Sequence, residues 1–156
     1  MTAATPVTAV QSGNGPLDAE TILRLTGWPA ADDPRWLEFH FQRCWPWLEA
    51  ALKASPLPTH TKADVWAGLQ SGSLELWPTP DSACLIQIVD YPTGVRVLHG
   101  LMAGGKLTEI KSTVERLEAY AKERGCDYAA PQGREGWLRA LPGYQRAYTV
   151  MCKELH

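Results

Sequence analysis

The chain has 156 residues, of which 45% are hydrophobic and 21% are charged, and its formal net charge is −2. This length and composition predict one globular domain, and the charge balance argues against a nucleic-acid surface, which needs clustered lysine and arginine. Tryptophan is unusually frequent, with 7 Trp against 2 Phe. Trp combines a large apolar area with one N–H donor, so this count predicts either a tryptophan-rich core or a packing surface for a partner.

Signals for export or membrane insertion are not found in the sequence. Residues 1–14 lack the basic stretch and the apolar stretch of a secretory signal, and no apolar run is long enough to span a bilayer. The four cysteines, Cys44, Cys84, Cys126 and Cys152, lie far apart and form no CxxC or CxxH pair. Zinc-ribbon and thioredoxin-type motifs are therefore excluded, and we expect free thiols in a reducing cytoplasm.

The first half of the chain predicts helices. Residues 1–16 carry few large apolar side chains and are interpreted as a flexible or partner-bound arm, followed by a short helix over 17–25. Apolar positions three and four residues apart predict a helix over 36–54, which Pro46 should kink or divide into two. Thr61 and Asp64 fit a capping box that begins a helix over 63–70.

The second half predicts strands around one long helix. Strands are expected over 74–77, 83–89 and 95–102, then an amphipathic helix over 107–124. A short strand over 126–130, a short helix over 134–141 and a last strand over 144–155 complete the pattern. This order predicts a three-stranded meander followed by a right-handed βαβ unit, in a mixed sheet with helices on both faces.

The second half also carries a family likeness. The segments "LTEIKSTVERLEAYAKERGCDYAA" and "GWLRALPGYQRAYTVMCKEL" resemble the second half of GNAT-type acyltransferases. Residues 61–155 also resemble a group of small GNAT-like proteins of tailed phages and prophages. The positions that match the motifs of that group are His60, Thr61, Asp64, Val65, Gly68, Gly72, Gly125, Cys126, Gly133, Arg134, Gly136, Trp137, Gly143, Tyr144, Thr149, Val150, Lys153, Glu154 and Leu155. The resemblance implies an α/β (α+β) fold, with one GNAT-like domain over 34–156 behind an N-terminal extension over 1–33.

Two departures from the GNAT pattern bear on activity. GNAT enzymes bind the pyrophosphate of acetyl-CoA on a Q/R-x-x-G-x-G/A loop before the long helix, and here that junction contains Gly104, Gly105, Lys106 and Thr108 instead. These residues are candidates for cofactor binding, although a tight strand-to-helix turn explains the two glycines more simply. The family's usual catalytic Tyr aligns with Arg139, which does not donate a proton near neutral pH.

The remaining candidates for chemistry each have a simpler structural interpretation. Tyr144 is a candidate acid or an aromatic packed on the long helix, and His99 is a candidate base or a strand histidine packed beside the sheet. Glu75 is a candidate base or, more simply, a strand carboxylate that points to water. His40 and Cys44 are four residues apart but have no third ligand, so no metal site is predicted.

Four tryptophans, Trp28, Trp36, Trp45 and Trp47, lie where the resemblance hardly extends, and they are candidate partner-binding residues. The first hypothesis is a phage-type GNAT-like protein that has lost ordinary acetyl-CoA chemistry. It would need no cofactor and would act in the host cytoplasm or the virion through phage structural proteins or self-association. The alternative is an acyl-CoA-dependent N-acyltransferase with an atypical pyrophosphate loop, for which acetyl-CoA is the cofactor.

Overall fold

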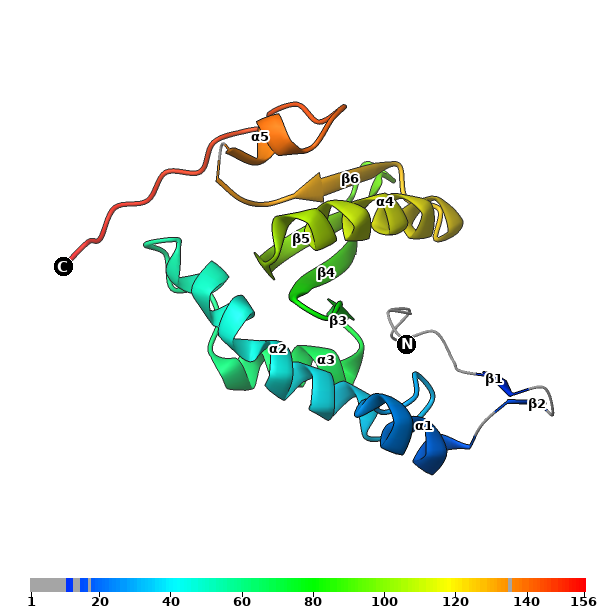
Figure 1. The fold of residues 1–156 in the computed structure, drawn as a ribbon. Coiled ribbons are helices and arrows are strands. Elements are labelled where there is room, and N and C mark those ends of the chain that lie inside the picture. Colours follow the sequence, from blue (N-terminus) through cyan, green and yellow to red (C-terminus); the bar gives the residue numbers. More distant parts are fainter. Residues whose placement is uncertain (1–10, 13–14, 17, 135) are drawn as a thin grey trace.

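The computed structural model describes residues 11–12, 15–16, 18–134 and 136–156. Most of the arm predicted over 1–16 therefore lies outside the described residues. The described elements are, in chain order (Figure 1), β1 (Gln11–Ser12), β2 (Gly15–Pro16), α1 (Ala19–Thr26), α2 (Trp36–Lys53), α3 (Lys62–Ser71), β3 (Glu75–Pro78), β4 (Ser82–Asp90), β5 (Arg96–Gly105), α4 (Leu107–Glu123), β6 (Tyr128–Pro131) and α5 (Gly136–Ala140).

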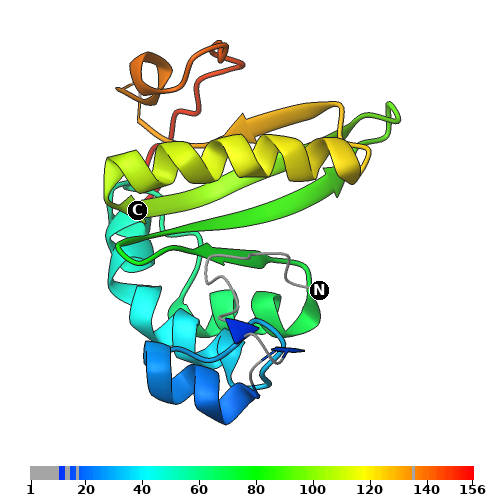
Figure 2. The same cartoon turned by 45° about the vertical axis from the view of Figure 1, so that its right-hand side comes forward.

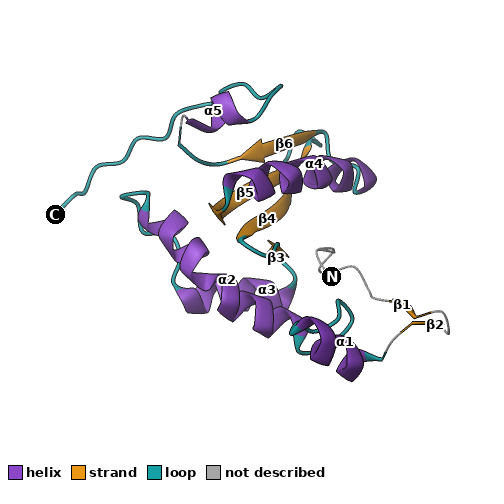
Figure 3. Ribbon diagram, in the orientation of Figure 1, coloured by secondary structure: helices purple, strands orange, loops and turns teal. Residues whose placement is uncertain are grey.

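The main sheet has the order β3-β4-β5-β6 (Figure 3). β3 with β4 and β4 with β5 are antiparallel, whereas β5 and β6 are parallel and are joined through α4. This arrangement confirms the predicted meander followed by a βαβ unit. Because β3 and β6 are the outer strands, each pairs with one neighbour only in this sheet.

Helices cover both faces of the sheet, as the sequence predicts. α4 lies across one face, while α2 and α3 lie on the other (Figure 2). Successive side chains of a strand point to opposite faces. On β4, Cys84 and Ile86 accordingly pack in the core under α4, and Ala83 and Leu85 pack in the core under α2 and α3.

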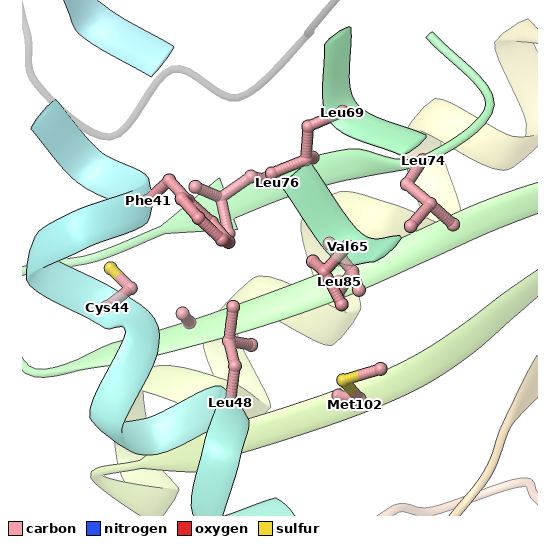
Figure 4. Close-up of a cluster of buried hydrophobic side chains, with 10 residues drawn as sticks. Phe41, Cys44, Leu48, Val65, Leu69, Leu74, Leu76, Leu85 and Met102 are labelled. Carbon is pink, nitrogen blue, oxygen red and sulfur yellow. The ribbon is translucent and has the colours of Figure 1, made fainter. Parts of the chain in front are cut away.

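The core under α2 and α3 is built from aliphatic side chains around one aromatic ring (Figure 4). Leu48 of α2, Val65 of α3 and Leu85 of β4 are completely buried there. Full burial of such side chains stabilises the fold by about 1.5–3 kcal/mol each. This core therefore fixes α2 and α3 on the sheet.

The helices begin and end largely as the sequence predicts. The capping box of α3 is formed, with the Asp64 N–H donating to Thr61 Oγ1 and the Thr61 N–H donating to Asp64 Oδ2. α2 is one continuous helix with Pro46 inside it, so the expected division into two does not occur. Proline removes one hydrogen bond from the helix and its ring crowds the preceding turn, but the burial of Cys44 and Leu48 on either side holds both halves against the sheet.

The prediction of a last strand over 144–155 is wrong. Residues 144–156 have neither helix nor strand, and Figure 1 draws them as an extended trace that leads away from α5. The alternating sequence pattern is present, but a strand forms only where a neighbour supplies backbone hydrogen bonds. Tyr148 and Val150 are both 68% exposed as a result.

Candidate functional site

The place where β5 and β6 separate is the first candidate site. The two strands pair from Val97↔Tyr128 to Gly100↔Pro131, and β5 then continues to Gly105 paired with β4 only. Directly after Gly100, one extra residue of β5, Leu101, forms a bulge opposite β4. A bulge bends its strand and raises its twist, so β5 turns away from β6 at this point.

An apolar cavity of about 50 Å³ lies at this divergence. Its walls come from β5, α4, β6 and α5, including Met102, Val114, Pro131, Trp137 and Leu141. Sites for drug-sized molecules usually enclose about 300–1,000 Å³. The cavity therefore has room for a small apolar group and not for a nucleotide cofactor.

Tyr144 closes one side of this cavity. Its hydroxyl donates to Glu118 Oε2 on α4 at 2.7 Å, which ties the chain after α5 to the long helix. Burial, reinforced by the Glu118 carboxylate, raises the pKa of Tyr144, so the phenol keeps its proton at neutral pH. Arg139, which aligns with the catalytic Tyr of GNAT enzymes, is exposed on α5.

The connection from β5 to α4 is a single residue, Lys106. The two glycines before it are in close contact with neighbouring backbone. A Cβ on Gly104 would lie 2.5 Å from the carbonyl oxygen of Trp47, and Gly105 has a φ of +103° with the carbonyl of Asp81 against it. Both positions therefore require glycine for packing and backbone conformation.

Acidic residues surround the N-terminus of α4, where an anion would bind in a phosphate-binding loop. The carboxylate of Glu109 accepts the N–H of Asp81 at 2.9 Å, and the carbonyl of Asp81 accepts the N–H of Lys106 at 2.8 Å. Lys106 and Thr108 are exposed at the same helix end. Because the Glu109 carboxylate interacts with this one lysine, the junction is a poor place for a pyrophosphate.

Glu75 is buried, so the expectation that it points to water is wrong. It is 8% exposed, and its Oε1 accepts the Tyr120 hydroxyl at 2.8 Å. Strand alternation places Glu75 on the same side of β3 as Trp77, which packs in the core under α4. Arg124 donates to the Tyr120 hydroxyl at 2.7 Å, and burial together with Glu75 raises the pKa of Tyr120 to about 12.

His99 lies on the opposite face of β5 from its neighbour Leu98, which packs in the core under α4. Its Nε2 is 2.7 Å from the hydroxyl of Tyr91, and partial burial lowers its pKa. The three candidate catalytic side chains thus occupy three separate places: Glu75 on the outer strand β3, His99 on the far face of β5, and Tyr144 beside α4. They do not form one catalytic group.

Of the four candidate partner-binding tryptophans, Trp36 is 4% exposed and packs in the core under α4. Trp45 and Trp47 are partly buried against the core under α2 and α3. Trp28 is also partly buried, with the guanidinium of Arg43 4.3 Å from its ring centre. The structure therefore places all four rings at least partly on their own domain.

His40 and Cys44 lie inside the fold and carry no metal cluster, since the described residues hold no group of three ligands. Arg43 contacts His40 Nδ1 at 3.1 Å and donates to the carbonyl oxygens of Thr79 and Pro80. Burial, together with the Arg43 charge, lowers the pKa of His40 to about 4, and burial raises the pKa of Cys44 to about 11. A neutral imidazole and an un-ionised thiol indicate a structural role.

Sequence reasoning missed three residues that shape these sites: Arg43, Glu118 and Tyr120. For Tyr120 a signal was available, because it follows Leu117 by three residues and so lies on the apolar side of the predicted helix. The roles of Arg43 and Glu118 depend on contacts with the distant residues Thr79 and Tyr144, which no local pattern indicates.

No family model matches the sequence, and no curated protein is significantly similar to it. Among solved structures, an acetyltransferase of Trypanosoma brucei is similar, with a TM-score of 0.50 and 13% sequence identity. That match covers 69% of this chain and 89% of the other. A tetramutant of the BH1408 protein from Bacillus halodurans also matches, with a TM-score of 0.47, 16% identity, and coverage of 69% of this chain and 86% of the other.

The fold is GNAT-like. The mixed four-stranded sheet flanked by helices and the likeness to the trypanosomal acetyltransferase confirm the fold expected from the sequence. At 13% identity this likeness concerns the fold and not the activity. Within the described part of the chain, no helix is long and apolar enough to cross a membrane.

Proposed function

We propose that this chain is a GNAT-like protein that has lost ordinary acetyl-CoA chemistry and acts by binding protein partners. The observation that carries the proposal is the connection between β5 and α4, which consists of Lys106 alone. A pyrophosphate needs several backbone N–H groups that converge from a loop and a helix end. One connecting residue cannot form such a loop.

The groups around this connection support the proposal. Gly104 and Gly105 contact the backbones of Trp47 and Asp81, so no space remains for a ligand against them. The cavity at the divergence of β5 and β6 is about 50 Å³, and it is lined by Trp137 of α5 and by Leu141 directly after α5. The pyrophosphate and the acyl group of acetyl-CoA would therefore both clash with protein atoms.

Accessible apolar side chains support the binding of protein partners. Leu25 on α1 is 62% exposed, Tyr128 on β6 is 64% exposed, and Met151 in the last segment is 88% exposed. Apolar side chains that gather on one exposed segment are typical of surfaces that another chain covers, and the last segment holds Tyr148, Val150, Met151 and Leu155, all at least 68% exposed. A role in assembling a phage particle is the finer form of this proposal, and its support is the sequence resemblance over residues 61–155.

An acyl-CoA-dependent N-acyltransferase is the second candidate. The likeness to an acetyltransferase fold and the apolar cavity beside the Tyr144 hydroxyl favour it. For this activity, α5 would have to move away from the divergence of β5 and β6. Acetyl-CoA would then lie along the opened cleft, with Lys106 and Thr108 near its phosphates.

Titration calorimetry with acetyl-CoA and with CoA separates the two candidates. The proposal predicts no binding of either ligand at millimolar concentration. Lys106→Ala is the informative variant, and Lys111→Ala, an exposed lysine further along α4, is its matched control. Micromolar binding that Lys106→Ala weakens and Lys111→Ala leaves intact would overturn the proposal and establish the acyltransferase.

A further inference from the structure

Three aromatic side chains meet where α2 and α3 pack together. The rings of Phe41 and Trp66 are stacked, with their centres 5.1 Å apart and an angle of 28° between them. Trp45, one turn further along α2, has its ring centre 5.6 Å from that of Phe41. Phe41 is 2% exposed, whereas Trp45 and Trp66 are each partly exposed. The part of this cluster that solvent reaches is therefore made largely of tryptophan.

A positive charge lies over these rings. The Lys62 ammonium is 5.7 Å from the ring centre of Trp45 and 5.8 Å from that of Phe41. A cation within about 6 Å of an aromatic ring centre is attracted to the ring face. One N–H of the same ammonium donates to Gln42 Oε1 at 2.8 Å. The faces of Phe41 and Trp45 and the amide oxygen of Gln42 thus form an ammonium site.

Lys62 is a weak occupant of this site. It is exposed, and holding its flexible four-carbon stem in one place costs conformational entropy. It is also the first residue of α3, where the partial positive charge of the helix N-terminus disfavours a cation. Asp64 is two residues further along the helix and so does not face it. The Lys62 ammonium can therefore leave the rings and return to water.

The chemistry of the site favours a quaternary ammonium group over a primary one. A lysine ammonium has three N–H donors, and Gln42 accepts one of them. A quaternary ammonium has no N–H, so it gives up less hydration when it moves onto an aromatic face. We propose that the ammonium site binds a quaternary ammonium group of a ligand, which displaces the Lys62 ammonium. This site lies on α2 and α3, so it is independent of acetyl-CoA binding at the junction of β5 and α4.

Choline and an uncharged analogue test whether the charge is needed. In the analogue a tert-butyl group replaces the trimethylammonium group, so the two molecules have nearly the same shape. In proton–nitrogen correlation spectra of the full chain, millimolar choline should shift the indole N–H signals of Trp45 and Trp66 saturably. The uncharged analogue should leave both signals in place.

Lys62→Ala tests the displacement. A cation–π contact of this kind favours the occupied site about 2–5-fold, so removing the internal competitor should lower the apparent Kd of choline about 3–6-fold. Lys111→Ala, which removes an exposed lysine of α4, is the matched control and should leave the Kd unchanged. Adding Trp45→Leu to Lys62→Ala should abolish the shift of the Trp66 signal, because the exposed ring face is lost.

Peptides distinguish the two sources of such a group. A peptide that carries trimethyllysine presents the same group as choline on a protein side chain. If this peptide binds more tightly than choline, the ligand is a methylated protein; if choline binds more tightly, the ligand is a small molecule. The same peptide with unmodified lysine should bind more weakly than the trimethylated form.

Three outcomes would overturn the proposal. If no ligand shifts the tryptophan signals of Lys62→Ala saturably, the cluster does not bind a quaternary ammonium. If the uncharged analogue shifts them as much as choline does, the rings form only an apolar surface. If Lys111→Ala lowers the Kd as much as Lys62→Ala does, the effect comes from the overall charge and not from displacement.

Discussion

Replacing Gly104 by Ala tests the reason for the two glycines before α4. The new Cβ would lie 2.5 Å from the carbonyl oxygen of Trp47 and 2.9 Å from its carbonyl carbon. Both atoms belong to the backbone of α2, which also holds the buried Leu48, so no side-chain rotation can relieve the contact. Either α2 or β5 must shift.

The size of the effect follows from two opposing contributions. Overpacking of this kind costs about 1–3 kcal/mol. Replacing glycine by alanine in a strand returns about 0.5–1 kcal/mol, because the unfolded chain loses backbone freedom. Because the contact is with backbone atoms, the cost should lie in the upper part of that range, at about 2–3 kcal/mol. We therefore expect the free energy of unfolding to fall by about 1–2.5 kcal/mol, which lowers Tm by about 2–10 °C in a domain of this size.

Urea and thermal unfolding of Gly104→Ala measure this loss. Gly136→Ala is the matched control, since a Cβ there meets nothing within 4 Å at the start of α5. We expect the control to be as stable as the unchanged protein or slightly more stable, by up to about 1 kcal/mol. If Gly104→Ala is as stable as the unchanged protein but has lost acetyl-CoA binding, the glycine serves a ligand and our reasoning is refuted.

Two further predictions concern buried polar groups. Tyr120→Phe removes the hydrogen bond to the buried Glu75 and should lower the free energy of unfolding by about 1–3 kcal/mol in urea unfolding, whereas Tyr128→Phe at an exposed site should change nothing. For His40, burial lowers the pKa from 6.5 to about 4, so the unfolded chain binds its proton first as the pH falls. The contribution of His40 to the free energy of unfolding should be complete above about pH 6.5 and should decline as the pH falls towards 4. His40→Gln should flatten the plot of unfolding free energy against pH in this range. If the slope is unchanged in the variant, groups other than His40 cause the decline.

The parts of the fold that depend on local pattern could be predicted from the sequence. The capping box of Thr61 and Asp64 forms as expected, because both partners lie within one turn. The amphipathic helix over 107–124 corresponds closely to α4 (Leu107–Glu123), since its spacing alone defines a buried side. The order of strands around this helix followed from the right-handed connection of parallel strands.

The errors concern contacts between distant residues. The segment over 144–155 has the alternation of a strand, but pairing depends on a sheet edge that the local sequence does not contain. Glu75 was expected in water because a lone carboxylate usually is, yet its partner Tyr120 lies 45 residues further along the chain. The sequence also could not show that Gly104 lies against α2, because this contact forms only when the helix packs on the sheet.

The most direct test of the central claim is the thermal unfolding of the unchanged protein with and without millimolar acetyl-CoA. A ligand present at 1,000 times its Kd stabilises the folded state by about 4.1 kcal/mol, which would raise Tm by about 8–16 °C here. Because Lys106 alone joins β5 to α4 and the adjacent cavity holds about 50 Å³, we predict no shift in Tm. A rise of several degrees that Lys106→Ala abolishes would contradict this account.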